Sequence, residues 1–482
     1  MITEQNCSML CDFYQLTMGN GYFKTKHAGR VAYFDVFFRR IPDGGGYAVC
    51  AGLEQVIGYI ENLHFDDDDI EFLRKKGIFD EGFLSYLRGF RFEGDIYAVP
   101  EGTPVFPYEP LITVRAPAIQ AQLVETMLLL LVNHQSLIAT KASRIVRAAQ
   151  GRAISEFGSR RAQGASGAVL GARAAYIGGC AGSACVIADK LYGVPASGTM
   201  AHSWVQMFDS ELEAFEEYCR IYPTSSVLLV DTYDVLRSGV PNAIKAFDNI
   251  LKPLGARPAG IRLDSGDIAY LSIQARKMLD EAGYPDCKII ASNSLDERLI
   301  SNLISQGAKI DAFGVGERLI TASSEPVFGG VYKLAATEEN GVITPKIKIS
   351  ENVVKITNPH FKKAYRLYDN ATGKALADLL CVHDEVIDSA KPLEIFDPDF
   401  TWKRKTLTDF TAKELQVPVF LGGKRVYCPP PIDEVRRHCA EGLSTLWESV
   451  LRFENPHRYY VDLSQKLWDI KHSLLDSRGG AK

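Results

Sequence analysis

The sequence predicts an α/β protein built around a parallel sheet that is covered by helices. Three observations lead to this fold class: a length of 482 residues, a composition of 46% hydrophobic and 23% charged residues, and a central region in which short apolar runs alternate with amphipathic helical segments. The length predicts two or three domains, each large enough for its own core. The alternation is typical of either a barrel or an open doubly wound sheet, and the pattern alone does not choose between them.

The part of the chain before this region has a different pattern. Residues 94–115 are short β-type runs interrupted by proline and glycine, which predicts edge strands and tight turns and not a parallel core. The acidic run Asp66 to Asp69 is interpreted as the start of a helix, where the helix dipole favours carboxylates. From Gln120 to Gln150 no glycine or proline occurs and apolar residues follow helical spacing, so one long helix is expected to lead into the next domain.

The central region contains the alternating elements. Strands are expected at 153–157, 227–230, 260–263, 288–291 and 310–314, and helices at 210–222, 240–254, 267–282 and 296–306. In a parallel sheet of this class, active sites form where the carboxyl ends of the strands meet. Each expected strand is followed at once by residues suited to chemistry: Gly158-Ser159-Arg160-Arg161, Asp231-Thr232-Tyr233-Asp234, Asp264-Ser265-Gly266-Asp267, Ser292-Asn293-Ser294 and Gly314-Val315-Gly316.

Some of these polar residues have a structural explanation. Asp234 and Asp267 precede expected helices and are interpreted as helix caps. Asp231, Asp264 and the arginine pair are left for chemistry. Further strands are expected at 332–335 and 346–349, and residues after about 385 carry no motif that we can interpret.

A single histidine lies in the segment Gly198-Thr199-Met200-Ala201-His202-Ser203-Trp204. An imidazole titrates near neutrality, so His202 is a candidate base, acid or nucleophile, although a packed, hydrogen-bonded histidine is the plainer alternative. Arginine forks and a glycine pair after a strand suit phosphate. Carboxylates in the same pocket would repel phosphate unless they bind ribose hydroxyls or a metal ion. The combination therefore points to a phosphorylated sugar held with Mg²⁺.

Several function classes are disfavoured. A formal net charge of −5 without any run of lysine or arginine argues against nucleic-acid binding. The longest apolar run, Met127 to Val132, is too short to cross a bilayer, and no signal-peptide pattern occurs, so no membrane partner and a cytoplasmic location are expected. The ten cysteines contain no CxxC pair and are interpreted as free thiols. Cys428, His438 and Cys439 lack a second ligand pair at zinc spacing, so no metal ligand is assigned.

Six segments, in this order along the chain, together resemble the nicotinate phosphoribosyltransferase family: Asp12–Met18, Phe157–Gly164, Gly198–Trp204, Val230–Asp234, Arg262–Asp267 and Gly329–Leu334. The resemblance extends from about Asp12 to Arg366. It implies an enzyme of NAD biosynthesis that makes nicotinate mononucleotide and diphosphate from nicotinate and phosphoribosyl diphosphate, coupled to ATP hydrolysis through a phosphohistidine. ATP is then a co-substrate, and Mg²⁺ is the expected cofactor.

The resemblance also implies a fold and an assembly. The expected fold is that of the type II phosphoribosyltransferases, an irregular α/β barrel with an α+β domain built from N-terminal segments. The expected domains are an α+β domain at 1–119, the barrel with the active site at 120–345, and a C-terminal region at 346–482 packed partly on the others. The expected assembly is a homodimer with shared active sites.

The resemblance further assigns roles to single residues. His202 is the phosphorylated histidine and Asp231 orients it. Substrate is bound by six residues, of which Tyr14 is expected from the neighbouring subunit and Asp264 on the ribose hydroxyls: Tyr14, Arg160, Thr199, Ser203, Arg262 and Asp264. The 5-phosphate is held by Gly314, Gly316 and Thr321. Arg160 and Arg262 are cationic forks suited to the planar carboxylate of nicotinate.

The chain departs from the family pattern at one place, and two other functions are possible interpretations of the sequence. Glu317-Arg318 stands where relatives often have small or hydroxyl residues, and a carboxylate is unfavourable beside phosphate unless it points outward or Arg318 compensates it. A nicotinamide or quinolinate phosphoribosyltransferase would share the fold and the sugar donor, but Gly-Thr-x-Ala-His-Ser favours nicotinate. A non-catalytic regulatory protein on the same fold is expected to lack His202 or the strand-end carboxylates, and both are present.

Overall fold

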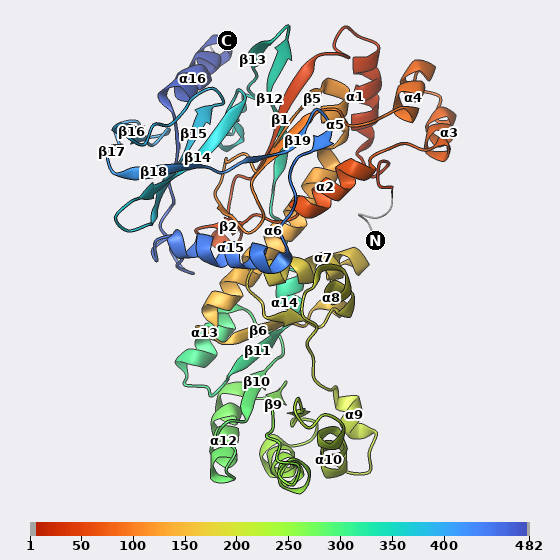
Figure 1. The fold of residues 1–482 in the computed structure, drawn as a ribbon, viewed down its shortest axis with the longest axis vertical. Helices are drawn as coiled ribbons and strands as arrows, with labels where there is room; N and C mark the ends of the chain where they lie inside the picture. The colour runs from red at the N-terminus through yellow and green to blue at the C-terminus, as the bar shows by residue number, and fades with distance from the viewer. Residues whose placement is uncertain (1–5, 480–482) are drawn as a thin grey trace. The chain divides into compact units, whose positions relative to one another are not determined.

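The computed structural model describes residues 6–479, whose fold is shown in Figure 1. The chain divides into two compact units. Unit 1 contains the residues up to Thr140 and those from Val327 onward, and unit 2 is Lys141–Pro326. The C-terminal part of the chain therefore belongs to the same unit as the N-terminal part, and the division into three domains stays a prediction.

Unit 2 is built around six parallel strands: β6 (Ala153–Glu156), β7 (Gly182–Ser183), β8 (Val227–Leu229), β9 (Gly260–Leu263), β10 (Lys288–Ala291) and β11 (Ala312–Val315). The five strands expected from the sequence are confirmed to within two residues, and β7 was not expected. The order across the sheet is β7-β6-β11-β10-β9-β8, so β6 pairs with the last strand of the unit.

Helices connect these strands: α7 (Gly164–Ile177), α8 (Val186–Tyr192), α9 (His202–Gln206), α10 (Glu211–Ile221), α11 (Val240–Ala246), α12 (Ile268–Glu281), α13 (Glu297–Ser305) and α14 (Glu317–Ile320). The helix expected at 240–254 is shorter as an α-helix, because five-residue π-helical turns flank α11 on both sides. The two cap predictions are confirmed. Asp234 accepts hydrogen bonds from the backbone of Leu236 and Arg237, and Asp267 accepts one from the backbone of Tyr270.

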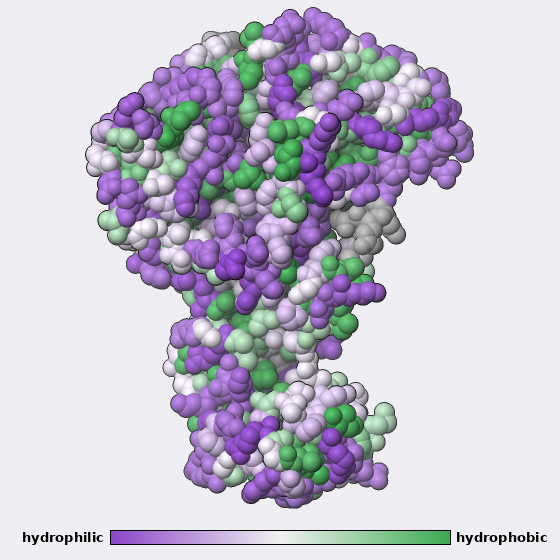
Figure 2. Space-filling view, in the orientation of Figure 1, coloured by the Kyte–Doolittle hydropathy of each residue, from purple (hydrophilic) through white to green (hydrophobic). Residues whose placement is uncertain are grey.

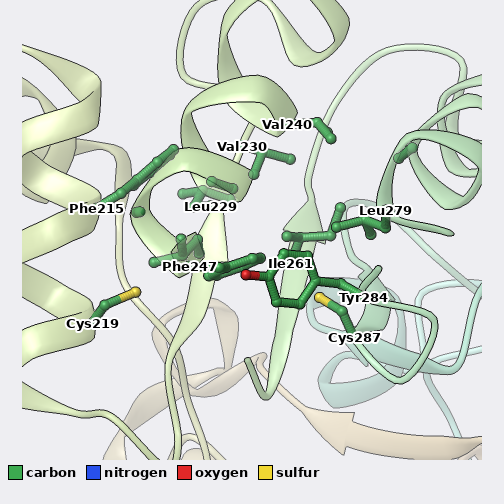
Figure 3. Packing of buried hydrophobic residues seen from close by; sticks show 14 of the residues in the cluster. Phe215, Cys219, Leu229, Val230, Val240, Phe247, Ile261, Leu279, Tyr284 and Cys287 are labelled. Atoms are coloured by element: carbon green, nitrogen blue, oxygen red, sulfur yellow. The ribbon is translucent and has the colours of Figure 1, made fainter. Parts of the chain in front are cut away.

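One apolar cluster holds this sheet against its helices (Figure 3). Leu229 on β8 and Ile261 on β9 point into the same layer as Phe215 from α10 and Leu279 from α12, and all four are fully buried. Complete burial of such side chains is worth about 1.5–3 kcal/mol each. This packing therefore fixes β8 and β9 in place up to the residues at which the candidate site begins.

Unit 1 contains a seven-stranded sheet with the order β13-β12-β1-β5-β3-β19-β20. Its strands are β13 (Val342–Pro345), β12 (Val331–Glu339), β1 (Val31–Phe37), β5 (Ile112–Pro117), β3 (Asp95–Ala98), β19 (Val417–Leu421) and β20 (Lys424–Arg425). Every pair is antiparallel, so the prediction that 94–115 is not a parallel core is confirmed. The prediction of edge strands is wrong for β5 and β3, which are covered by the sequence-distant strands β1 and β19, but it holds for β4 (Pro104–Val105), which pairs with one strand only.

The strand expected at 346–349 is also misplaced. The observed strand β13 ends at Pro345, and residues 346–350 have no regular structure. The reason is the turn before it, Asn340-Gly341, in which both residues have positive φ angles, of 52° and 77°. Such an Asn-Gly pair forms a tight hairpin, and the hairpin starts the returning strand at Val342.

The remaining strands of unit 1 form a four-stranded sheet and two small pairs. The four-stranded sheet contains β18 (Phe410–Glu414), β14 (Lys362–Asp369), β15 (Ala375–Val382) and β21 (Val461–Leu463) in that order. The pairs are β16 (Leu393–Phe396) with β17 (Arg404–Leu407), and β2 (Ala48–Val49) with β4 (Pro104–Val105). The region after about residue 385, where the sequence shows no interpretable motif, thus contributes the strands β16 to β21.

The helices of unit 1 are α1 (Phe13–Phe23), α2 (Leu53–Asn62), α3 (Asp67–Lys75), α4 (Glu81–Arg88), α5 (Ala118–Leu123), α15 (Ile432–Thr445) and α16 (Gln465–Gly479). Asp66 caps α3 through the backbone of Asp69, which confirms the interpretation of the acidic run. The long helix expected from Gln120 is divided at Val124 into α5 and α6 (Glu125–Ala148), and α6 continues past the boundary between the units.

The described part of the chain holds no helix with the length and apolarity needed to cross a membrane. The face shown in Figure 2 is mostly hydrophilic, with hydrophobic residues in scattered positions. All ten cysteines are free, as expected, and seven of them are buried. Within residues 6–479 no group of three or more potential metal-ligating side chains occurs, and the ring of His438 instead lies 3.0 Å from the Thr103 hydroxyl.

Candidate active site

The candidate site lies at the carboxyl edge of the parallel sheet in unit 2. Because all six strands run in the same direction, the residues that follow them reach this one edge. The segments that begin at Phe157, Val230, Asp264, Ser292 and Gly316 therefore share it.

His202 is the first residue of α9, and its ring is held through one nitrogen. Nδ1 lies 3.1 Å from the hydroxyl oxygen of Thr232, in the segment after β8. Nε2 lies 4.0 Å from a carboxylate oxygen of Asp264, and the His202 side chain is 41% exposed. A neutral imidazole that donates from Nδ1 to the hydroxyl would keep the lone pair on Nε2, which is the nitrogen available to a ligand.

Arg262 on β9 holds several parts of the edge together. Its Nη1 donates to the Thr199 hydroxyl at 2.7 Å and to the Met200 carbonyl at 3.2 Å. Its Nη2 donates to Asp264 at 3.2 Å, and its Nε donates to the Ser292 hydroxyl at 2.9 Å. A guanidinium has five N–H groups, so one on Nη2 remains for substrate. The two-point fork expected from Arg262 is already engaged within the protein.

Asp264 follows β9 directly and lies between Arg262 and His202. Its carboxylate accepts a short hydrogen bond from Ser292 besides the one from Arg262. Burial alone would raise the pKa of Asp264, but these two partners outweigh it, so the pKa lies below its ordinary value. Asp264 is therefore an anion at neutral pH, as required of an acceptor for sugar hydroxyls.

Asp231 has different partners from those expected. One oxygen of Asp231 accepts hydrogen bonds from the Asp264 backbone at 3.1 Å and from the Ser265 hydroxyl at 2.6 Å. The other oxygen, Oδ1, is buried and has no protein partner among residues 6–479. The groups next to the imidazole of His202 are Thr232 and Asp264 instead. Asp231 thus fixes the segment that carries Asp264, and a direct contact with the histidine is not part of this arrangement.

The remaining candidates for substrate contact are exposed. Arg160 lies in a 3₁₀ turn (Ser159–Arg161) after β6 and makes no hydrogen bond or ion pair within residues 6–479. Ser203 is exposed on α9. Tyr14 lies on α1 of unit 1, where burial and the carboxylate of Glu125 raise its pKa. Of the two arginines expected to bind the carboxylate of nicotinate, Arg160 is thus the one whose guanidinium has no partner within residues 6–479.

Gly314, within β11, and Gly316, directly after it, pack closely against the segment after β6. A Cβ atom at Gly314 would lie 2.4 Å from the ring of Phe157, and a Cβ atom at Gly158 would lie 2.7 Å from the carbonyl oxygen of Gly316. Real Cβ atoms do not approach so closely, so both positions require glycine. The hydroxyl of Thr321 donates to the Glu317 carbonyl at 2.6 Å, which leaves its oxygen free to accept.

The departure at Glu317-Arg318 has a structural answer. Glu317 is exposed and accepts a hydrogen bond from the Ser294 hydroxyl at 3.2 Å. Arg318 pairs with Asp296 at 2.5 Å and therefore does not neutralise Glu317. The carboxylate of Glu317 is stabilised by solvent and by the Ser294 hydroxyl. Arg318 connects the segment after β11 to Asp296, the residue before α13.

Comparison with known proteins decides the family. Sequence models described as the N-terminal domain, the family and the C-terminal domain of nicotinate phosphoribosyltransferase match residues 9–133, 152–370 and 361–471. A nicotinate phosphoribosyltransferase of Bacillus subtilis is 45% identical over 470 residues, which cover 97% of this chain and 95% of that protein. The chain belongs to the nicotinate phosphoribosyltransferase family. One of Dictyostelium discoideum is 37% identical over 527 residues, which cover 97% of this chain and 88% of that protein.

A solved structure gives the same result for the fold. The crystal structure of human nicotinic acid phosphoribosyltransferase matches with a TM-score of 0.82 and 29% identity, covering 97% of this chain and 99% of that chain. The mixed α/β architecture is therefore that of the nicotinate phosphoribosyltransferase family, and the chain is an enzyme of this family. The match to the C-terminal family model also covers the region in which no motif had been found.

The sequence analysis missed a buried carboxyl group at this edge of the sheet. Glu156 is the last residue of β6 and is fully buried. Its two oxygens accept hydrogen bonds from the Gly158 backbone and, at 2.6 Å, from the Ser183 hydroxyl. Burial raises its pKa, although both hydrogen bonds oppose the rise. A charged residue within an apolar strand was the available signal, because such a residue needs a reason to be there.

Backbone conformation marks two further positions that the sequence did not reveal. Asn293 and Ser294, after β10, have φ angles of 88° and 33°, and Ala322, after α14, has a φ angle of 44°. Positive φ is tolerated by asparagine but is costly for serine and alanine. Both strained segments adjoin the residues expected to hold the 5-phosphate, which are Gly314, Gly316 and Thr321.

Proposed function

We propose that this chain transfers the phosphoribosyl group of 5-phosphoribosyl 1-diphosphate to nicotinate, with ATP as co-substrate, in the salvage of NAD precursors. The observation that carries the proposal is the cluster of His202, Arg262 and Asp264 at one edge of the sheet. It combines a partly exposed nucleophile, a cation and an ionised carboxylate. Asp264 accepts a hydrogen bond from Arg262 at 3.2 Å and lies 4.0 Å from Nε2 of His202. The names of the full-length relatives support the same activity.

In the nucleotide-forming step the pyridine nitrogen of nicotinate attacks C1 of the ribose, and the bond from C1 to the diphosphate oxygen breaks. Asp264 accepts hydrogen bonds from the ribose hydroxyls, as its lowered pKa allows. Gly314 and Gly316 hold the 5-phosphate through backbone N–H groups, and Thr321 joins them when its hydroxyl turns from the Glu317 carbonyl to donate to the phosphate. Diphosphate leaves with the electron pair of the broken bond.

In the ATP-dependent step the lone pair on Nε2 of His202 attacks the γ-phosphorus, and the bond from that phosphorus to the ADP oxygen breaks. The Thr232 hydroxyl accepts a hydrogen bond from Nδ1–H and so keeps the ring in the reactive tautomer. Water later takes the phosphoryl group from the histidine, which regenerates the neutral ring. Asp231 acts indirectly, by fixing the backbone of Asp264.

Magnesium would enter with the phosphates of the substrates. Within residues 6–479 no cluster of three ligating side chains exists, which suits Mg²⁺ because that ion usually takes one or two carboxylates and completes its shell with phosphates and water. The buried oxygen Oδ1 of Asp231, which has no protein partner in that range, is the group best suited to hold it. The ion would neutralise charge on the leaving diphosphate.

Arg160 is assigned to the carboxylate of nicotinate, since its fork is exposed and unengaged. Arg262 contributes its remaining N–H and holds Thr199 in place, and Ser203 adds a hydroxyl next to His202. A neutral amide would leave the Arg160 donors poorly paired. Discrimination against nicotinamide of about a thousandfold or more is expected from such a mismatch.

The sheet of unit 2 is proposed to be an irregular barrel. The pairing of β6 with β11 joins the first and last strands of the unit, as in a barrel, while β7 and β8 are the two strands left at the edges. Closure would need only those two to approach.

A homodimer is proposed because one side of α1 and Leu10, three residues before the helix begins, are apolar and exposed. The exposed fractions are 43% for Leu10, 53% for Phe13, 44% for Tyr14 and 38% for Met18, at helical spacing. A second copy that covers this face would bring Tyr14 to the active site of its neighbour.

Product analysis tests the activity. The purified protein is incubated with phosphoribosyl diphosphate and, in parallel, with nicotinate, nicotinamide or quinolinate, each with and without Mg-ATP. Nicotinate mononucleotide and diphosphate should form, and ATP should increase the yield. Equal use of nicotinamide would reject the carboxylate assignment, and no nucleotide from any of the three would reject the proposed function.

Subunit complementation tests the shared site. Tyr14→Ala and His202→Ala are each expected to be inactive, and mixed dimers should recover part of the activity because one of their two sites is intact. Subunit exchange is verified by native mass spectrometry. No recovery after exchange would mean that each chain builds its own site.

A further inference from the structure

Unit 1 contains a cavity of about 730 Å³ that the proposed function does not use. Its volume lies in the range of small-molecule sites. The walls come from the segment after β1, the turn at Phe106–Tyr108, the segment 353–358, the segment 455–463 and helix α16. None of the residues assigned to catalysis or to substrate lines it.

The cavity is cationic in a protein whose net charge is −5. Its walls carry Arg39, Arg458 and Lys471 against a single carboxylate, that of Asp399. Arg458 and Asp399 are 3.8 Å apart and mostly exposed, which makes a weak pair. The two other cations therefore give this cavity an excess of positive charge.

Neither Arg39 nor Lys471 forms an ion pair at contact distance within residues 6–479, and the carboxylate that acts on Lys471 from further away is that of Asp399. The Nε atom of Arg39 is buried without a hydrogen-bond partner in residues 6–479, and the guanidinium lies 5.4 Å from the ring centre of Phe37. The ammonium of Lys471 donates to the neutral side chain of Asn358 at 2.9 Å. Burial lowers the pKa of Lys471, which reflects the cost of keeping this cation away from water. An anionic ligand would offset that cost for both groups.

The floor of the cavity is aromatic and rigid. The rings of Phe106 and Tyr459 are stacked with centres 3.7 Å apart. The Tyr459 hydroxyl donates to Asp378 at 2.9 Å, and Asp378 is paired with Arg366 in the interior. Phe106 and Tyr459 are 1% and 6% exposed, so they give the cavity a rigid wall that stays in place without a ligand but offers little open ring face.

The backbone of the wall is strained. Tyr108 has a φ angle of 70°, which is rare for a bulky residue, and Asn455 has a φ angle of 47°. Tyr108 is held at both ends, since its N–H donates to the Phe38 carbonyl at 2.8 Å and its hydroxyl donates to the Val354 carbonyl at 3.0 Å. Strain of this kind gathers at ligand sites, where the surrounding structure maintains it.

We infer that this cavity is a second ligand site and that it binds a nucleotide, whose phosphate pairs with Arg39 and Lys471 and whose base fills the remaining volume against the rigid wall of Phe106 and Tyr459. A neutral ligand would leave both cations unpaired, and a cationic ligand would be repelled. Inorganic phosphate would satisfy the charges but fill only a small part of the volume. A nucleotide meets all three features, the charge, the rigid wall and the size.

Calorimetric titration with AMP tests this, because AMP has no γ-phosphate to transfer to His202. Arg39→Ala and Lys471→Met should each weaken AMP binding by about tenfold or more, as expected for the loss of a charge-assisted contact. Lys466→Ala is the matched control on α16, since Lys466 is paired with Asp384 at 2.7 Å and does not line the cavity. It should bind AMP like the wild type. Arg39→Lys keeps the charge and should lose less than Arg39→Ala.

Other outcomes overturn the inference. Equal affinity in all variants, or no binding to the wild type, would reject the site. Loss of AMP binding in Arg262→Ala without any loss in Arg39→Ala would place AMP at the edge of the unit 2 sheet instead. Adenosine that binds as tightly as AMP would reject the role of the cations, and inorganic phosphate that binds as tightly would reject the nucleotide. Thermal melting of each variant verifies that it is folded.

Discussion

The two sheets of this molecule are built in opposite ways. In unit 2 all six strands are parallel, so the segments that follow them meet at one edge in an order that the sequence displays. In unit 1 the main sheet is antiparallel and joins distant segments, as where Val31 of β1 faces Glu338 of β12. The residues that form a site at the edge of a parallel sheet can therefore be predicted from local sequence patterns. The neighbours in an antiparallel sheet built from long-range pairs cannot.

The charged groups of the two units differ in how deeply they are buried. At the edge of unit 2 the side chains of Asp264 and His202 remain 31% and 41% exposed, so they can exchange partners for substrate. In unit 1 the pair of Arg366 and Asp378 is buried to within 1% of complete. We infer that the first set serves chemistry and the second serves stability, and four predictions test the contrast.

The largest effect is expected from His202→Ala. Without the imidazole no phosphoryl group can be held, so ATP hydrolysis coupled to nucleotide formation should disappear while the melting temperature changes little, because the side chain is partly exposed. Incubation with γ-labelled ATP and assay for acid-labile, alkali-stable phosphate measures the labelling. Wild-type labelling of His202→Ala would place the phosphoryl group on another residue.

Next in size is a pair of charge-conserving changes. Arg262→Lys should lower kcat/KM for nicotinate by about a hundredfold, because lysine cannot keep the four contacts that hold Thr199, Met200, Asp264 and Ser292 together. Arg160→Lys should cost about tenfold, mainly in KM, because only the substrate contact changes from two points to one.

Steady-state kinetics on nicotinate and nicotinamide measure both variants. If Arg160→Lys proved harmless to the preference for nicotinate, the carboxylate would have to be read by another group.

A stability effect is expected in unit 1. Asp378→Asn removes the carboxylate that is paired with the buried guanidinium of Arg366 and leaves only the buried carboxyl of Glu109 beside it. Removal of one partner from such a pair costs about 3–5 kcal/mol. Urea unfolding should show this loss, while kcat/KM of the folded fraction stays close to the wild type. The double variant Arg366→Met with Asp378→Leu should recover part of the stability, because no unpaired charge remains. A loss of activity without a loss of stability would contradict the structural role of the pair.

The smallest effect concerns pH. The pKa of Asp264 is lower in the folded protein than in the unfolded chain, so its ionisation stabilises the fold above the unfolded value of about 4, and this stabilisation is lost as pH falls through the folded pKa. Asp264→Asn should therefore melt below the wild type at pH 7, and the difference should shrink below about pH 4. A difference independent of pH would mean that the charge of Asp264 does not contribute.

Much of unit 2 was predictable because its elements are local. The strands at 260–263 and 288–291 have the expected bounds, and the caps Asp234 and Asp267 are where the helix starts require them. The partners of the side chains were not predictable. Asp231 was expected to orient His202, but the contact falls to Thr232, the next residue along, because the direction of each side chain depends on how the loop packs.

The sequence by itself determined the family, the parallel sheet and the set of residues at its edge, since periodicity, caps and motifs are properties of neighbouring residues. Only the tertiary structure decided that β3 and β5 lie inside their sheet, that Glu156 is buried under the site, and that Arg262 is engaged while Arg160 is not. It also decided the cavity of unit 1, whose walls come from residues 39 to 475. The physical reason is that burial and pairing depend on contacts between segments hundreds of residues apart, which no local pattern encodes.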